Sequence, residues 1–238
     1  MTTATIVILY LVVFVAALVQ GTSCIGFELI FSPVATLLAP ELVPTIVLLL
    51  MLPLNAFVAL REWRSIDWRG GAWISATRIV FTLVGLLMVA VLSTTGLTVL
   101  VALVTIGAAL VSLFAPPFAP TPAAFLAAGA VTGISETATG VGGPPMGLVY
   151  QHSRPAVLRS TVATCFFIGE VVSLVALTVT GSAPDGWLGD SLVLLPALVL
   201  GTVGSTLVVR RFPLLDLRMA VIVFSVLSGA VLLVQAVA

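Results

Sequence analysis

Glu136 is the only charged residue between Ile79 and Ser153. It lies inside Gly133–Pro145, which reads GISETATGVGGPP. A carboxylate at the centre of a bilayer costs at least about 2.5–3.5 kcal/mol on insertion scales, so a functional role is expected for it. The glycines, prolines and hydroxyl side chains around it should break a helix. We interpret the stretch as non-helical backbone at membrane depth, which persists only where protein buries it or where it lines a cavity.

Three further charged residues, Glu28, Glu170 and Arg78, stand in similarly apolar runs. Burial favours the neutral form of a carboxyl group. A protonated Glu donates to an anion whereas an ionised one repels it, so we expect proton and anion to bind together. The alternative is a protonated Glu bonded to backbone freed by a helix break. Arg78, about two turns inside its run, either snorkels to the membrane surface or pairs with a Glu in a cavity. The predicted proton-coupling residues are Glu28, Glu136, Glu170 and Arg78.

Two short patterns resemble helix starts within apolar sequence, Ser32-Pro33 and Gly143-Pro144-Pro145. Ser and Gly suit the N-cap, and Pro suits the first helical position. A helix starting there would direct free N–H groups and the positive end of its dipole into the membrane, which favours an anion. The alternative is that these prolines only mark turns between core helices. The candidate anion-binding residues here are Ser23, Ser32, Pro33, Ser135, Thr137, Thr139, Gly142, Gly143 and Pro144.

The composition indicates an all-α integral membrane protein that forms one membrane domain over 1–238. The chain is 61% hydrophobic and 8% charged, with a mean hydropathy of +1.30, whereas soluble domains are about 25% charged. A net charge of zero without a Lys-rich tail gives no reason to expect nucleic acid. Cys24 and Cys165 sit in apolar surroundings and are expected to be buried thiols, without a disulfide or metal. The N-terminus lacks the basic region of a signal peptide and is expected to belong to the mature chain.

Six apolar runs are long enough to cross a bilayer, which takes about 20 residues. Two further apolar regions, 5–39 and 122–151, are interrupted. The six runs are Val43–Leu60, Gly71–Leu92, Leu97–Ala115, Ala156–Thr180, Leu188–Val209 and Leu217–Ala238.

The two interrupted regions suggest an internal repeat. Each is followed by three long apolar runs, which divides the chain into repeats of about 1–115 and 120–238. An ungapped overlay at an offset of 112 residues gives three identities across the breaks. The matched pairs are Gly21 with Gly133, Ser23 with Ser135, and Pro33 with Pro145.

The arginines predict the topology. All nine basic residues are Arg, in clusters at 61–78, 154–159 and 210–218. If each interrupted region crosses the membrane, four Arg face five across it. If each is a re-entrant hairpin, all nine lie on one side, which the positive-inside rule favours. We therefore expect cytoplasmic Arg-rich loops and both termini outside, with Asp185 and Asp190 also outside. The inner interface would carry Trp63, Trp68 and Trp73, and the outer one Trp187.

A hairpin plus three crossings is an odd number, so the second repeat would be inverted relative to the first. Inverted repeats whose broken helices meet at the midplane are an architecture of secondary transporters. Arg159, near the cytoplasmic mouth, either attracts anions or anchors the topology, and His152 is expected at the surface. The pairs Gly129/Gly133 and Gly201/Ser205 should let helices pack closely.

The chain resembles the TauE/SafE sulfite exporter family along nearly its whole length. Its first half carries the pattern Ile25-Gly26-Phe27 to Pro33, then Pro44, then the segment REWRSIDWR at 61–69. Its second half carries GVGGPP at 140–145 and Leu158-Arg159-Ser160-Thr161. The resemblance implies transport of small sulfur-containing anions, such as sulfite, sulfoacetate and other organosulfonates, across the cytoplasmic membrane. It also adds Gly26, Phe27 and Arg159 to the candidate substrate-binding residues. Members more often carry neutral residues at the positions of the three Glu.

The sequence thus predicts a proton-coupled secondary transporter or permease that works by alternating access, with its site at the two breaks. The alternatives are an anion channel, or a transporter of another small carboxylate or oxyanion. No Ser/His, Cys/His or metal-ligand set occurs, so we expect neither an enzyme nor a cofactor or metal. The expected partners are a small anionic substrate and the lipid bilayer of the cell membrane, with a homodimer as a candidate assembly.

Overall fold

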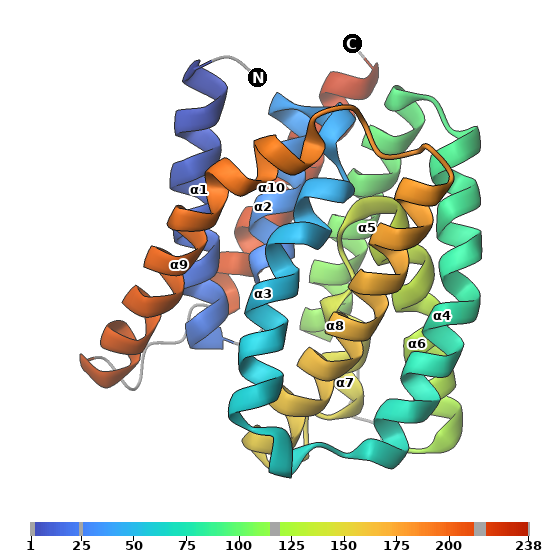
Figure 1. The fold of residues 1–238 in the computed structure, drawn as a ribbon, viewed down its shortest axis with the longest axis vertical. Helices are drawn as coiled ribbons and strands as arrows, with labels where there is room; N and C mark the ends of the chain where they lie inside the picture. The colour runs from blue at the N-terminus through green and yellow to red at the C-terminus, as the bar shows by residue number, and fades with distance from the viewer. Residues whose placement is uncertain (1–2, 24–25, 115–119, 212–217, 238) are drawn as a thin grey trace.

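The chain is all-helical wherever the structure describes it, which confirms the predicted fold class. The computed structural model describes residues 3–23, 26–114, 120–211 and 218–237, and no strand occurs in these ranges (Figure 1). The helices are α1 Thr3–Ser23, α2 Phe27–Leu38, η1 Pro40–Leu42, α3 Thr45–Arg61, η2 Trp63–Ser65, α4 Trp68–Val91, α5 Thr94–Phe114, α6 Pro122–Thr139, α7 Gly143–Val149, α8 Pro155–Val179, α9 Trp187–Arg211 and α10 Arg218–Val237.

Six described helices are long and apolar enough to cross a membrane, namely α1, α4, α5, α8, α9 and α10. Five of them match predicted runs to within about three residues. The sixth predicted run, Val43–Leu60, also matches a helix to within two residues, but α3 has only 17 residues, at the lower limit of about 17–25 for a crossing. Val43 has an extended backbone, as a residue before proline favours, so the helix starts only at Thr45. Helix α1, which covers the first part of the predicted interrupted region 5–39, has 21 residues and is long enough to cross the membrane by itself.

The first helix break lies earlier than predicted. Helix α2 begins at Phe27 after Gly26, whose φ of 152° is in the region that favours glycine. The predicted helix start at Ser32-Pro33 is therefore wrong, and Pro33 lies inside α2. A proline here removes the hydrogen bond to the carbonyl four residues back, that of Leu29. The Ser225 hydroxyl lies 3.4 Å from this carbonyl and 2.7 Å from that of Val221 on its own helix, so a polar group of α10 faces the freed carbonyl.

The second break is shorter than predicted. Helix α6 continues through Glu136 to Thr139, so only residues 140–142 are non-helical. Gly140 ends α6 in the left-handed conformation, with φ 71°, a common helix C-terminus. Helix α7 begins at Gly143, which confirms the predicted start to within one residue. The predicted helix break within Gly133–Pro145 is confirmed, but it is confined to residues 140–142. Glycines and hydroxyl residues lower helix propensity only modestly, so residues 133–139 stay helical.

The offset of 112 residues between the repeats stays a prediction, because the two short helices differ in length. The short helices α2 and α7 start at Phe27 and Gly143, which are 116 residues apart. Their ends, Leu38 and Val149, are 111 residues apart, so the starts and the ends of the two helices fall on either side of the predicted offset.

The helix contacts follow the order of elements in the two halves. Each half has a long helix, a short helix and three longer ones (Figure 1). Helix α4 packs on α6, and α9 packs on α1; α4 also contacts α8, and α9 contacts α3. Across the halves, α3 packs on α8 and α5 on α10. The fourth helix of each half thus packs on the first and third helices of the other half, as expected for two related halves. The inverted orientation of the second half stays a prediction.

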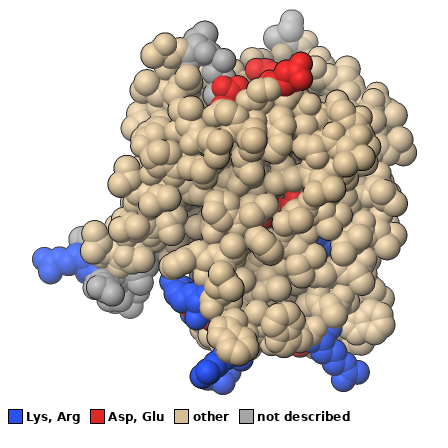
Figure 2. Space-filling model, in the orientation of Figure 1, with Lys and Arg blue, Asp and Glu red and all other residues tan. Residues whose placement is uncertain are grey.

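Charged side chains gather at the two ends of the helix bundle. Both termini and the α8–α9 connection lie at the upper end in Figure 1, and the α3–α4 connection and the start of α8 lie at the lower end. Figure 2 shows Arg side chains at the lower end and acidic ones at the upper end. This separation agrees with the re-entrant interpretation of the arginine clusters. Which end faces the cytoplasm stays a prediction.

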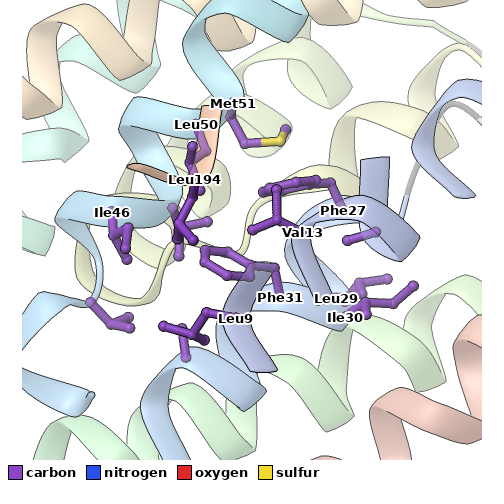
Figure 3. Close-up of a cluster of buried hydrophobic side chains, with 14 of the residues drawn as sticks. Leu9, Val13, Phe27, Leu29, Ile30, Phe31, Ile46, Leu50, Met51 and Leu194 are labelled. Carbon is purple, nitrogen blue, oxygen red and sulfur yellow. The ribbon is translucent and has the colours of Figure 1, made fainter. Parts of the chain in front are cut away.

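A large apolar cluster fixes the short helix α2 in the interior (Figure 3). Phe27 and Phe31 of α2 are fully buried, with ring centroids 5.3 Å apart. They pack among residues of α1, α3 and α9, such as Val13, Ile46 and Leu194. In a bilayer such packing acts through van der Waals contacts, which hold the helix break in one place.

Small residues bring two helix pairs into backbone contact, as predicted. A Cβ on Gly129 would meet the carbonyl of Ile74, so α6 lies directly on α4. On α9, a Cβ at Gly201 would meet the carbonyl of Phe14 in α1. The predicted close packing of both small pairs is confirmed.

Candidate functional site

Four buried charged side chains from four helices meet in the interior. They are Glu28 on α2, Arg78 on α4, Glu136 on α6 and Glu170 on α8, each at most 3% exposed. These four residues are the set predicted for proton coupling. Buried charges persist only when they are paired and hydrogen-bonded, so their partners determine what the site can do.

Arg78 forms the ion pair at the centre of this charged cluster. Its Nη2 lies 2.5 Å from Glu136 Oε2, and its Nη1 donates to the carbonyl of Cys165 at 2.9 Å. The guanidinium carbon lies 5.0 Å from the ring centroid of Phe166, within the range of a cation–π contact. Of the two predicted alternatives, the structure has the pairing with a Glu rather than the snorkelling side chain.

Gly169 makes the space that the guanidinium occupies. A Cβ built on Gly169 would overlap Nε and Cζ of Arg78. Phe166, Gly169 and Glu170 are three and four residues apart, so they lie on one face of α8. This face of α8 therefore covers the charged end of Arg78.

Glu28 bridges the two helix breaks. Its carboxylate accepts from the backbone N–H of Gly142 at 2.9 Å and also from that of Gly143. From the sequence, we expected these N–H groups to bind a substrate anion. In the structure they donate instead to the carboxylate of Glu28. The predicted alternative of a Glu bonded to backbone freed by a break therefore describes Glu28.

Glu170 has a single hydrogen-bond partner among the described residues. Asn55 Nδ2 of α3 donates to its Oε1 at 2.6 Å, and its Oε2 is buried without such a partner. One Arg faces three carboxyl groups in this cluster, so full ionisation would leave two uncompensated negative charges. Neutrality in a buried site requires two protons or bound cations.

Hydroxyl groups tie the breaks to one another. Ser32 Oγ of α2 donates to the carbonyl of Thr139 at 2.6 Å, and the Thr139 hydroxyl donates to the carbonyl of Ser135 at 2.6 Å. The N–H of Val141 donates to the Thr139 hydroxyl at 3.2 Å. The turn between α6 and α7 is thus held by side chains from both halves of the chain.

A comparison with known protein families shows which family the chain belongs to. The family model described as Sulfite exporter TauE/SafE matches residues 9–232, nearly the whole chain. The chain belongs to the TauE/SafE family. No curated protein and no solved structure gave a match. The family implies a membrane exporter or permease for sulfite or related sulfur anions.

In this TauE/SafE protein the other predicted substrate-binding residues are dispersed. Thr137 hydrogen-bonds the Ser173 hydroxyl at 2.8 Å, close to the charged cluster. Ser135 lines an apolar groove of about 210 Å³ between α5, α6 and α7, together with Gly142 and Pro144. Phe27 lies in the apolar cluster around α2. The side chain of Ser23 is outside the described residues.

Arg159 lies outside the buried charged cluster. Its guanidinium pairs with Glu62, with Nη2 to Oε1 at 2.8 Å. The residue lines a cavity near the basic end of the bundle, and its side chain is 31% exposed. His152 is exposed, as predicted.

Several polar residues of the site were missed by the sequence interpretation. Asn55, Thr82, Thr132 and Ser173 are each buried. Asn55 was detectable, because it is the one amide in the apolar run 43–60. The hydroxyl residues gave no signal, since Ser and Thr also satisfy themselves within a helix by bonding the carbonyl four residues back.

Within the described ranges, neither a disulfide nor a metal-ligand cluster belongs to the site. Cys165 is a free, buried thiol, as predicted, and Cys24 lies outside the described residues. No group of three His, Cys, Asp or Glu side chains among the described residues has a spacing that could hold a metal ion.

Proposed function

We propose that this TauE/SafE protein is a proton-coupled secondary transporter of small sulfur-containing anions such as sulfite or an organosulfonate. The observation that carries the proposal is the Arg78–Glu136 ion pair, buried where the helix breaks of both halves meet. A fully buried cation held by a protonatable partner is suited to exchange that partner for a substrate anion.

The coupling follows from competition for one cation. While Glu136 is ionised it neutralises Arg78, and an incoming anion would be repelled. Protonation of Glu136 removes that negative charge and leaves Arg78 able to pair with the anion. The two events would therefore favour each other, and one proton would accompany one negative charge into the site.

Alternating access would come from movement of the two halves around this site. Glu28 and Ser32 on α2 form hydrogen bonds with the backbone at the turn between α6 and α7. The first half of the chain is thus bonded to the second half at its helix break. Rocking of one repeat against the other around a fixed central site is the general behaviour of such transporters.

Flux measurements in proteoliposomes test the function. We expect saturable sulfite uptake that depends on the pH gradient, and we expect Glu136→Gln to weaken the pH dependence more than sulfite binding. Glu41→Gln, an exposed carboxylate in η1, is the matched control and should leave the profile unchanged. Each variant is first checked for monodisperse protein, because a neutral Gln leaves Arg78 without its counter-charge.

Two results would reject this mechanism. Unchanged pH dependence in both Glu28→Gln and Glu136→Gln removes proton coupling through these groups. Conductance that rises without saturation favours the alternative, an anion channel built on the same breaks.

A further inference from the structure

A cavity of about 80 Å³ opens between α1, α3, α8 and α9 near the basic end of the bundle. A cavity needs roughly 10–15 Å³ to hold one water, so this one has room for several waters or one small oxyanion. Both halves of the chain contribute walls, with Thr202 and Ser205 supplying hydroxyls from α9. Among the described residues that line it, none is acidic.

Two arginines border this cavity. Arg61 is the last residue of α3, and Arg159 lies in the first turns of α8. Both contact the same carboxylate, that of Glu62, at 3.2 and 2.8 Å. Positive charge therefore exceeds negative charge among these three side chains. A cleft lined by one sign of charge attracts ions of the other sign and raises their rate of arrival.

Asn55 and Phe166 form the inner end of the cavity. Asn55 precedes Arg61 by six residues on α3, so it lies about 9 Å deeper at 1.5 Å per residue. Phe166 follows Arg159 by seven residues on α8, which gives a similar depth of about 10 Å. Both residues line the cavity and are largely buried, at 3% and 4% exposure.

The buried charged cluster lies directly behind these two side chains. Asn55 Nδ2 donates to Glu170 Oε1 at 2.6 Å, and Phe166 covers the guanidinium of Arg78. Glu170 Oε2 and Arg78 Nε are buried, and neither has a hydrogen-bond partner in the described part of the chain. The amide of Asn55 is thus shared between the cavity wall and a carboxyl group of the cluster.

We propose that this cavity is an anion-binding vestibule and that Asn55 is the gate residue between it and the transport site. The ligand class is a small oxyanion, attracted by Arg61 and Arg159. An anion that reaches the inner end of the cavity replaces Glu170 as the acceptor of the hydrogen bond from the Asn55 amide. The Glu170 carboxylate then faces the negative charge of that anion as well as Glu28 on α2 and Glu136 on α6. Arg78 on α4 is the only cation of the cluster. Glu170 therefore binds a proton when the anion arrives. The role of Asn55 as a gate depends on the proposed transport function, whereas anion binding in the cavity does not.

Thiol modification tests the vestibule independently of transport. Val58→Cys places a thiol on the half-buried α3 wall of the cavity, in a background with Cys24→Ser and Cys165→Ala. Detergent-solubilised protein is treated with anionic sulfonatoethyl methanethiosulfonate or cationic trimethylammonioethyl methanethiosulfonate. Each reagent forms a mixed disulfide with the thiolate and releases methanesulfinate.

We expect the anionic-to-cationic rate ratio at Val58→Cys to exceed that at the control Ser65→Cys by about tenfold or more. Adding Arg61→Gln and Arg159→Gln should remove most of this preference. Equal ratios at the two positions would overturn the vestibule. Ser65 lies in η2, at the same end of the bundle but outside the cavity lining.

The gate is tested by Asn55→Leu, which keeps the approximate size of the side chain and removes its donor. We expect sulfite uptake to fall about tenfold and its pH profile to flatten, with partial recovery of both in Asn55→Gln. A residue with a merely structural role would change the amount of folded protein and leave the pH profile as it is. An unchanged profile in a wild type that transports sulfite overturns the gate and leaves the proposed function intact. Anion-selective labelling in a wild type that transports no anion rejects the proposed function and the gate, and retains the vestibule.

Discussion

At the scale of single residues, the site depends on how Arg78 is enclosed. A guanidinium keeps its charge under all ordinary conditions, so its pairing with Glu136 and its contact with Phe166 determine what it can bind. Gly169 provides the space for it, because any side chain at this position would occupy the place of the guanidinium. The geometry of the site therefore depends on a residue without a functional group.

Gly169→Ala should displace Arg78 from Glu136 and abolish most sulfite flux. Overpacking of a buried site costs about 1–3 kcal/mol, so we expect a folded protein of lower thermal stability. Flux in proteoliposomes and thermal unfolding in detergent measure the two effects. Gly189→Ala on α9, with open space around it, is the control and should behave as the wild type. Full activity in Gly169→Ala would show that the position of Arg78 is unimportant.

At the scale of helices, the contact between α4 and α6 positions the ion pair. Gly129 and Gly133 of α6 lie against the backbone of α4, and Gly133 lies against Arg78 itself. Gly85 of α4 meets the backbone of Ile134 in the same way. Close approach of this kind drives helix association in a membrane through van der Waals packing. The helix that carries Glu136 is thus locked to the one that carries Arg78.

Gly133→Val should separate α4 from α6 and destabilise the protein by about 1–3 kcal/mol. The added methyl groups would meet the Arg78 carbonyl, which is backbone and cannot move aside as a side chain does. Thermal unfolding in detergent measures the loss. Gly107→Val on α5, where an added Cβ would point into open space, should have a much smaller effect. Equal stability of the two variants would contradict the close α4–α6 packing.

At the scale of the whole molecule, charge is separated along the bundle axis. The termini and the α8–α9 connection lie opposite the ends of α3 and α9 (Figure 1). Large apolar side chains such as Leu83, Leu87, Val203 and Leu207 are exposed on the outer surface between the two ends. In a lipid bilayer these side chains would contact acyl chains, while the exposed arginines of the described residues remain at one interface and Arg78 stays buried.

Single-cysteine labelling checks the orientation. In a background without the native cysteines, Asp185→Cys should react with a membrane-impermeant thiol reagent added outside intact cells. Ser65→Cys should react only after the membrane is permeabilised. The positive-inside rule gives this assignment, and the opposite pattern would reverse the proposed orientation.

The sequence by itself determined the class of the protein and its four charged residues of interest. Hydrophobic runs are read directly from composition, because a bilayer imposes a fixed length on each crossing. An isolated Glu or Arg within such a run is conspicuous for the same reason, and so Glu28, Arg78, Glu136 and Glu170 were identified in advance. The arginine clusters likewise determined the expected topology without structural knowledge.

Only the tertiary structure decided which partner each charge has and where each helix breaks. Glu28 bonds Gly142, which lies 114 residues away, and no local pattern encodes such a distant contact. The actual break after α1 depends on the backbone of Gly26, whereas Pro33 lies inside α2, where the Ser225 hydroxyl of α10 faces the freed carbonyl at 3.4 Å. Asn55 meets Glu170 only because α3 packs on α8. Propensities are local, whereas burial and hydrogen-bond satisfaction depend on neighbours brought together by the fold.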